Sequence, residues 1–449
     1  MTHVAAHPIE ARPSTTLWLA LTGAGLAILT AAGPTLHHRL GGWALIVLFA
    51  VGGLAACSAA RLGEHADQRT ALLVILAGAV AMRLSLLFVE PYLSSDIYRY
   101  IWDGRVQAAG INPYRYVPKA PELAALRDAA IWPYINRPDY AVTIYPPAAQ
   151  AIFLAVTRVG ESVVAMKLGL LLFEAAAIWA LIALLQRQGA PATRVALYAW
   201  HPLPVWEIAG NGHVDAAMMA FLMVGLLVFL QGRTLLAGVA VTLGALIKPV
   251  ALLALPVFWR PWSWRLPLAV AATLAVAYLP YLSVGSGVLG FLPGYLQEEG
   301  FASGGGGFKL VWLLQQLTGP QPGAGTVYIV LAALLLTALA LAAGFRTDRS
   351  EQAAIRWLGW LLIAFLVLSS PHYPWYFLVL VPFLALRASA TAWVLTTACV
   401  LFYDVVGNDG LPGYTTRITV FTLATLAAFA YDLWRERKRP SSSPLGETP

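Results

Sequence analysis

The chain has 449 residues, of which 59% are hydrophobic and 11% are charged. Soluble proteins carry roughly 25% charged residues, so this chain has too few charges to cover a soluble surface. Composition thereby excludes a soluble enzyme, a disordered chain, a coiled coil, a collagen and a disulfide scaffold. At roughly 20 apolar residues per span, the hydrophobic content limits the chain to about 13 membrane spans. We therefore predict an all-α polytopic membrane protein.

The net charge of +7 is best explained by membrane topology. Cations at cytoplasmic helix ends orient spans. No basic cluster is large enough for a duplex, so we expect no nucleic-acid partner. Cys57 and Cys399 each lie in an apolar run and show no metal-binding spacing. The first apolar run, 15–32, is compatible with a signal peptide, but the spans that follow at once favour an uncleaved anchor.

The first three apolar runs, near 15–33, 43–60 and 70–89, orient the chain. The connection between the second and third runs carries Arg61 and Arg69, which indicates the cytoplasmic side. The N-terminus is then inside, and the loop that starts at Glu90 is outside. Up to Tyr145 this loop contains six acids and six bases, a balance that predicts structured ion pairs. They are Glu90, Asp96, Asp103, Glu122, Asp128, Asp139, Arg99, Arg105, Arg115, Lys119, Arg127 and Arg137.

Further apolar runs predict the remaining spans. They lie near 161–186, 194–209, 213–231, 234–247, 250–260, 266–283, 326–344, 356–370, 374–388, 390–406 and 415–434. Two stretches leave alternatives open. Residues 147–160 are too short to span and are either re-entrant or interfacial. Residues 234–260 contain Lys248-Pro249 and form either one kinked span or two broken ones.

The chain therefore divides into six parts, with no soluble domain and no clear repeat. These parts are N-terminal spans (1–89), a periplasmic loop with candidate catalytic residues (90–147), a transmembrane core (148–283), a glycine-containing periplasmic loop (284–325), C-terminal spans (326–436) and a disordered tail (437–449). The run Gly304–Gly307 in the second loop lacks the strand and the Lys-Ser/Thr of a P-loop. The glycine run predicts no more than a flexible loop that orders over substrate, with Phe308 and Lys309 as its anchor.

The strongest candidate site is the segment LSSDIYRYIWDGRVQAAGINPYRYVP, at 93–118. Ser94-Ser95 predicts a helix start and Gly110 its end. Asp96, Arg99 and Asp103 share one helix face. One interpretation is structural: Asp96 complements the helix dipole, and Arg99 pairs with Asp103.

The functional interpretation makes Asp96 a general base at the membrane surface that deprotonates an attacking hydroxyl. Arg99 and Arg105 would then neutralise a phosphate on the leaving group.

A second group, at 200–221, contains Glu207, Asn211, His213 and Asp215 at the outer end of a span. His213 and Asp215 are two positions apart and lack a clear third ligand, so a metal site is the less favoured alternative. We favour helix capping and substrate hydrogen bonding by Asn211, His213 and Asp215. We expect no cofactor and assign no metal ligand.

Lys248 lies alone in an apolar run, LGALIKPVALLALP. Such a lysine either extends to the interface or meets a buried anion. Pro249 would open the helix beside it, which favours a cavity wall and an anion.

A fourth group, SSPHYPWYFLVLVP, places His372, Tyr373, Trp375 and Tyr376 at an outer helix start. An aromatic belt explains the rings but does not explain a histidine between two prolines. Tyr145 precedes the two prolines that turn the outer loop back toward the membrane.

Five motifs, in this order on a polytopic scaffold, resemble the GT-C superfamily of integral membrane glycosyltransferases. They are SSDIYRYIWDGRVQAAGINPY, TIYPPAAQ, NGHVD, LIKP and PHYPWY, which together span about 90–385. The chain is most similar to bacterial polyprenyl-phosphate-mannose-dependent mannosyltransferases and, more distantly, to the GPI mannosyltransferase I catalytic subunit. The first motif is fairly specific, and the other four count by their order. The family's first outer loop follows the first span, so an extra N-terminal hairpin is expected here.

The resemblance implies a GT-C-like bundle of about 12–14 helices in the bacterial inner membrane, with a structured first periplasmic loop of short helices. It implies a sugar on a polyprenyl phosphate, used at the periplasmic or exterior face with inversion at the anomeric carbon. The base role carries over to Asp96. A lipid or glycan hydroxyl would be the acceptor, in contact with membrane lipids. Mannose is the favoured sugar, and galactose, glucose and aminoarabinose are open alternatives.

Our hypothesis is therefore an inverting hexosyltransferase. Asp96 is the catalytic base, and the donor phosphate is bound by Arg99, Arg105, Lys248 and His372. The substrate-binding residues are Asp103, Tyr145, Asn211, His213, Asp215, Tyr373 and Tyr376.

Two other classes of protein compete with this hypothesis. A polytopic transporter or lipid flippase would more often show inverted repeats and a midplane site, whereas here the polar groups gather at one face. A ligase of another chemistry would need a nucleophile or metal cluster that the sequence does not show.

Overall fold

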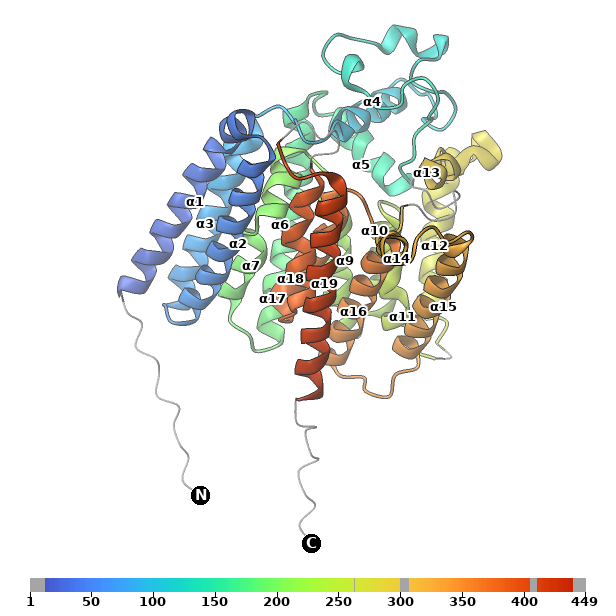
Figure 1. Cartoon of the computed structure of the whole chain (residues 1–449). Coiled ribbons are helices and arrows are strands. Elements are labelled where there is room, and N and C mark those ends of the chain that lie inside the picture. Colours follow the sequence, from blue (N-terminus) through green and yellow to red (C-terminus); the bar gives the residue numbers. More distant parts are fainter. Residues whose placement is uncertain (1–12, 262, 299–306, 404–409, 439–449) are drawn as a thin grey trace, which may run out of the picture.

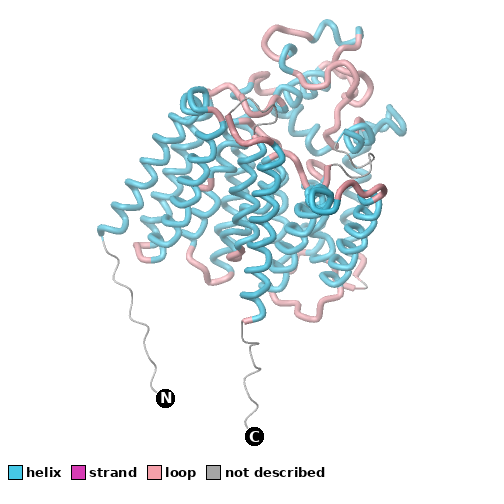
Figure 2. Tube along the Cα trace, in the orientation of Figure 1, coloured by secondary structure: helices cyan, strands magenta, loops and turns pink. Residues whose placement is uncertain are grey.

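The computed structural model describes residues 13–261, 263–298, 307–403 and 410–438. Across these ranges the chain forms helices, turns and loops and contains no strand (Figure 2). The all-α polytopic fold predicted from composition is therefore confirmed. Of the predicted disordered tail, Arg437 is the last residue of α19 and Lys438 follows it, so the tail was predicted to begin too early. Residues 439–449 and the glycines 304–306 lie outside the described residues.

Seven helical segments among the described residues are long and apolar enough to cross a membrane. They are α1 (Pro13–Leu40), α2 (Gly42–Glu64), α3 (Gln68–Leu87), α6 (Val163–Arg187), α12 (Arg265–Tyr278) with its continuation to Glu298, α15 (Ala324–Gly344) and α16 (Glu351–Ser369). Each has the continuous apolar run that a span requires.

The remaining helices complete the bundle. The apolar ones are α5 (Pro147–Thr157), α9 (Asp215–Leu230), α10 (Thr234–Ala245), η5 with α11 (Pro249–Leu253 and Ala254–Phe258), η7 with α17 (Pro374–Leu380 and Val381–Leu386), and α18 with η8 (Ala390–Ala398 and Cys399–Phe402). The others are α4 (Asp96–Ala108), η1 (Pro121–Leu126), η2 (Trp132–Tyr134), η6 (Leu279–Leu289), α13 (Leu292–Glu298), α14 (Lys309–Thr318) and α19 (Tyr414–Arg437).

The loop from Glu90 to Tyr145 forms a cap over one end of the bundle (Figure 1). The long helices run side by side, and α4, α5 and α13 gather at one end of them. The start of α1 and the end of α19 lie at the opposite end. Segments far apart in sequence therefore meet beneath the cap.

The structure shows one short helix in the first open stretch and two separate helices in the second. Residues 147–157 form α5, which packs on α4 and is too short to cross a bilayer. The stretch 234–260 forms two separate helices, α10 and η5 with α11, because the chain is extended at Lys248 before Pro249. At this break the carbonyl of Leu246 accepts hydrogen bonds from the first amides of α5. The break thus ties the cap to the membrane core.

The predicted single span at 194–209 is wrong in detail. The chain there forms η3 (Ala192–Val195), α7 (Ala196–Ala199), α8 (Pro202–Pro204) and η4, a π-helical turn (Val205–Gly210). Pro202 and Pro204 cause the interruption, since proline has no amide hydrogen and fixes its own backbone.

Several buried cations outside the cap satisfy the carbonyl groups at helix ends. Lys167 donates to the carbonyls of Leu86 and Val89 at the end of α3. Lys309 donates to the carbonyls of Ser370 and Pro371 after α16. The last carbonyls of a helix lack partners within it, so these lysines complete the helices. Charge in an apolar run therefore has a structural role at these two positions.

Candidate active site

A cavity of about 1370 Å³ lies where the cap meets the bundle. Its wall is formed by the segment before α4, the start of α4, the loop 129–146, the break at 247–250, the segment 288–296 and the residues around the start of η7. The wall combines charged groups with apolar side chains such as Ile247, Leu292 and Phe365. Such a cavity is large enough for a sugar together with part of a hydrocarbon chain.

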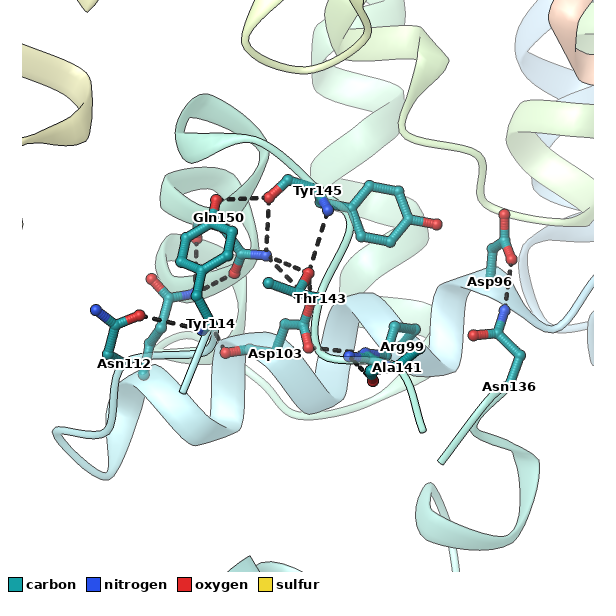
Figure 3. Close-up of polar contacts among 11 residues, drawn as sticks. Asp96, Arg99, Asp103, Asn112, Tyr114, Asn136, Ala141, Thr143, Tyr145 and Gln150 are labelled. Atoms are coloured by element: carbon teal, nitrogen blue, oxygen red, sulfur yellow. Dashed lines mark hydrogen bonds and ion pairs between the residues drawn. The ribbon is translucent and has the colours of Figure 1, made fainter. Parts of the chain in front are cut away.

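Asp96 is the first residue of α4 and lines the cavity. Asn136 donates a hydrogen bond of 2.7 Å to one of its carboxylate oxygens, and the Tyr145 hydroxyl points toward it (Figure 3). Burial raises the pKa of the Asp96 carboxyl, while the nearby positive charges of Lys248 and Arg137 oppose that rise. The Ser95 side chain does not cap α4; instead the Asp96 amide donates to the Ser94 hydroxyl.

Lys248 lines the same cavity at the break between α10 and η5. Its ammonium lies 2.6 Å from the buried carboxylate of Asp215 and 5.0 Å from the centre of the Tyr376 ring. Asp215 itself lies behind the wall, with 2% of its side chain exposed. Asp215 is therefore placed to orient Lys248, and Lys248 is placed to meet an anion in the cavity.

His213 forms a second layer behind the cavity. Its Nδ1 lies 4.0 Å from an Asp96 oxygen and its Nε2 lies 3.2 Å from a Glu207 oxygen, while its ring stacks on Trp375. Glu207 accepts hydrogen bonds from Asn211 and from the Tyr403 hydroxyl. This buried layer supports the wall from behind.

Asp103 lies on α4 away from the cavity, in a buried network (Figure 3). Arg99 Nε donates to Asp103 over 2.9 Å, and Arg99 also donates to the carbonyl of Ala141. The hydroxyl of Thr143 and the amide of Gln150 donate to the other Asp103 oxygen. The network holds the segment before Tyr145 against α4 and α5, which positions the Tyr145 ring.

Two predicted phosphate ligands lie outside the cavity. Arg105 pairs with Asp128 and Glu161, at 2.7 Å each, and holds the cap together. The Nε2 of His372 lies 3.1 Å from the carbonyl of Gly307, and His372 does not line the cavity. The sequence signals for these two residues, a place near Asp96 for Arg105 and a place between two prolines for His372, do not indicate the partners that the fold provides.

The structure thus sorts the predicted residues into three sets. The cavity wall includes Asp96, Arg99, Tyr145, Lys248, Tyr373 and Tyr376. Behind it lie Asp103, Asn211, His213 and Asp215, and outside it lie Arg105 and His372.

Sequence reasoning missed Asn136, Arg137 and Trp375, which also line the cavity. Nothing in the sequence distinguishes Arg137 from the five other bases of the same loop.

The residues that the structure describes contain no group of three or more His, Cys, Asp or Glu side chains arranged to hold a metal ion. His213 and Asp215 therefore do not form such a group with a third ligand.

Comparison with known proteins identifies one family. The family model described as Alpha-(1->6)-mannopyranosyltransferase, N-terminal domain, matches residues 13–275, which is more than half of the chain. The chain is 25% identical over 409 residues to Alpha-(1->6)-mannopyranosyltransferase A of Mycobacterium tuberculosis, covering 81% of this chain and 76% of that protein. It is 29% identical over 189 residues to Alpha-(1->6)-mannopyranosyltransferase A of Corynebacterium glutamicum, covering 40% and 37% respectively. The resemblance to membrane mannosyltransferases is confirmed.

Proposed function

The chain belongs to the alpha-(1->6)-mannopyranosyltransferase family, and from this premise we propose that it transfers a mannosyl group from a polyprenyl-phosphate donor to a hydroxyl of a lipid or glycan acceptor at the outer face of the membrane. The observation that carries the proposal is the position of Asp96 on the wall of the large cavity, with Lys248 on the same wall.

Asp96 acts as the general base in this reaction. The acceptor hydroxyl loses its proton to the Asp96 carboxylate as its oxygen forms a bond to the anomeric carbon. The bond from that carbon to the donor phosphate oxygen breaks, and attack from the opposite side inverts the anomeric carbon. The released polyprenyl phosphate takes the bonding electrons and needs little protonation. A raised pKa suits Asp96 to this task, because a base works best when its pKa is near the operating pH.

Lys248 is suited to the developing charge on the leaving phosphate. A cation fixed beside the reacting centre stabilises that charge without reorganising as the reaction proceeds. Asp215 holds the Lys248 ammonium in place. The apolar part of the wall, including Ile247 and Leu292, offers a surface for the first isoprene units of the donor.

Charge at the opposite end of the bundle supports an outer position for the cavity. Arg61 and Arg69 flank the turn from α2 to α3, and Arg187 and Arg435 close α6 and α19. These helix ends lie away from the cap (Figure 1). Cations gather on the cytoplasmic side of a membrane protein, so the cap and the cavity would face outward.

The test is an assay of the purified chain with polyprenyl-phosphate-mannose and a panel of other polyprenyl-phosphate sugars. We expect consumption of the mannosyl donor, and Asp96→Asn should lower turnover about 100- to 10,000-fold while leaving the thermal transition in place. Glu122→Gln, on an exposed acid of the same loop, is the matched control. Normal turnover by the Asp96 variant would remove the base assignment. Movement of lipid-linked sugar across vesicles without transfer would favour a flippase.

A further inference from the structure

Arg137 is a cavity residue with an unusual backbone. Its φ is +50°, a left-handed conformation that residues with a side chain rarely adopt. The preceding residue, Asn136, donates the hydrogen bond to Asp96. Such a conformation persists where the surrounding structure enforces it, and it is concentrated at functional sites. The turn therefore places a guanidinium next to the residue that holds the proposed base.

Three bases line the cavity, and their acidic partners differ. Arg99 is paired with Asp103 and Lys248 with Asp215, and both acids have 2% of their side chains exposed. Arg137 is paired at 2.8 Å with Glu298, whose side chain is 30% exposed. Exposed ion pairs contribute little net stability. The partner of Arg137 can therefore be exchanged for another anion at lower cost than the other two.

Glu298 is the last residue of α13, the short helix beside the cavity mouth. One of its oxygens accepts from Arg137 Nε and the other accepts from the Tyr140 hydroxyl, at 2.9 Å. The Glu298 carboxylate thus accepts one hydrogen bond from a guanidinium and one from a phenol. Two oxygens of a phosphate could accept the same two hydrogen bonds. A guanidinium also binds phosphate oxygens, through one or two N–H groups.

We propose that Arg137 binds the phosphate of the donor, and that Glu298 occupies the guanidinium until the phosphate replaces it. The inference rests on the proposed function, since it takes the polyprenyl-phosphate donor as given. Phosphate between Arg137 and Lys248 would lie beside Asp96, whose carboxylate feels the charge of both cations. Displacement of Glu298 would free the end of α13 when the donor binds.

The test measures binding of farnesyl phosphate, with farnesol as the probe that lacks the phosphate, to the purified full chain in detergent. Arg137→Ala should weaken farnesyl phosphate binding about 10- to 100-fold and leave farnesol binding unchanged. Arg137→Lys should be intermediate, since an ammonium lacks the fork. Glu298→Gln breaks the same ion pair but keeps the guanidinium, so it should bind farnesyl phosphate as tightly as the native chain or several-fold more tightly.

Arg115→Ala and Glu122→Gln change exposed residues of the same loop outside the cavity wall and serve as matched controls. Native affinity in Arg137→Ala would overturn the inference. So would a loss in Glu298→Gln equal to that in Arg137→Ala, because the ion pair would then matter only for the fold. If Arg137→Ala does not fold, Arg137→Lys and Glu298→Gln still decide, since the first must weaken farnesyl phosphate binding and the second must not. A native chain that binds farnesol and farnesyl phosphate equally would instead refute the proposed donor.

Discussion

Helix α4 carries two aspartates, Asp96 as its first residue and Asp103 near its middle, and the two carboxylates have different surroundings. Asp103 accepts hydrogen bonds from Arg99, Thr143 and Gln150 and is closed off from the cavity. Asp96 accepts a hydrogen bond from Asn136 and lines the cavity. Three fixed donors occupy most of the acceptor sites of Asp103, and its burial keeps a substrate away from the rest. The number of fixed donors around an acid thus separates a structural role from a chemical one, even on one face of one helix.

The largest expected effect on stability comes from substitution of the buried aspartate, Asp103. Asp103→Ala leaves the Arg99 guanidinium buried without its partner, which should lower the free energy of unfolding by about 3–5 kcal/mol. Asp96→Ala should change it by less than about 1 kcal/mol, because its carboxylate reaches the cavity. Thermal unfolding of both variants in detergent measures the difference. Equal losses of stability in the two variants would contradict the different roles of Asp96 and Asp103.

Thr143 connects Asp103 to the cavity residue Tyr145, since its hydroxyl also accepts hydrogen bonds from the Gln150 side chain and from the Tyr145 amide. Thr143→Val removes these contacts at nearly constant volume, and we expect a loss of about 1–3 kcal/mol of stability. Thr419→Val, at a half-buried helix position whose hydroxyl bonds only within its own helix, is the control. An unchanged unfolding transition in Thr143→Val would show that the network does not hold the cap.

Asp96, the aspartate that lines the cavity, should determine the pH dependence of the transfer rate. Asp96 must be deprotonated to act as a base, so kcat/KM should fall as the pH falls through its raised pKa. Lys248 lowers that pKa by its charge, so Lys248→Met should move the acidic limb to higher pH. Lys119→Met, on an exposed loop lysine, should leave the limb in place. A limb unmoved in Lys248→Met would argue against Asp96 as the titrating group.

The smallest effect is expected at Arg105, which neither lines the cavity nor takes part in the Asp103 network. Its acids Asp128 and Glu161 are partly exposed. Arg105→Gln should therefore cost about 1 kcal/mol of stability and change transfer less than about twofold. A large rise in the KM for the donor would return Arg105 to the phosphate site and show that the cap rearranges on binding.

The sequence predicted the helices well, because apolar runs and helix ends are local signals. The helix expected after Ser94-Ser95 and before Gly110 is observed as Asp96–Ala108. Partners distant in the chain were not predictable. Arg137 meets Glu298 161 positions away, and no local pattern announces that contact.

Buried lysines illustrate the same limit. Lys167 and Lys248 both lie among apolar residues, yet one completes the end of α3 and the other lines the cavity. The difference depends on which backbone or side chain the fold brings opposite each ammonium. Charge in an apolar run therefore predicts a partner but does not identify it.

Gly290 sets a limit on how this cavity can be altered. Its φ is +57°, and a Cβ there would lie 2.0 Å from the carbonyl oxygen of Thr143, whose backbone also accepts from the Phe291 amide. Beside the cavity wall, two backbone segments are thus in direct contact, and no rotamer change can separate them. A side chain at position 290 would have to move one of the two loops, so the cavity cannot be widened here by side-chain substitution alone.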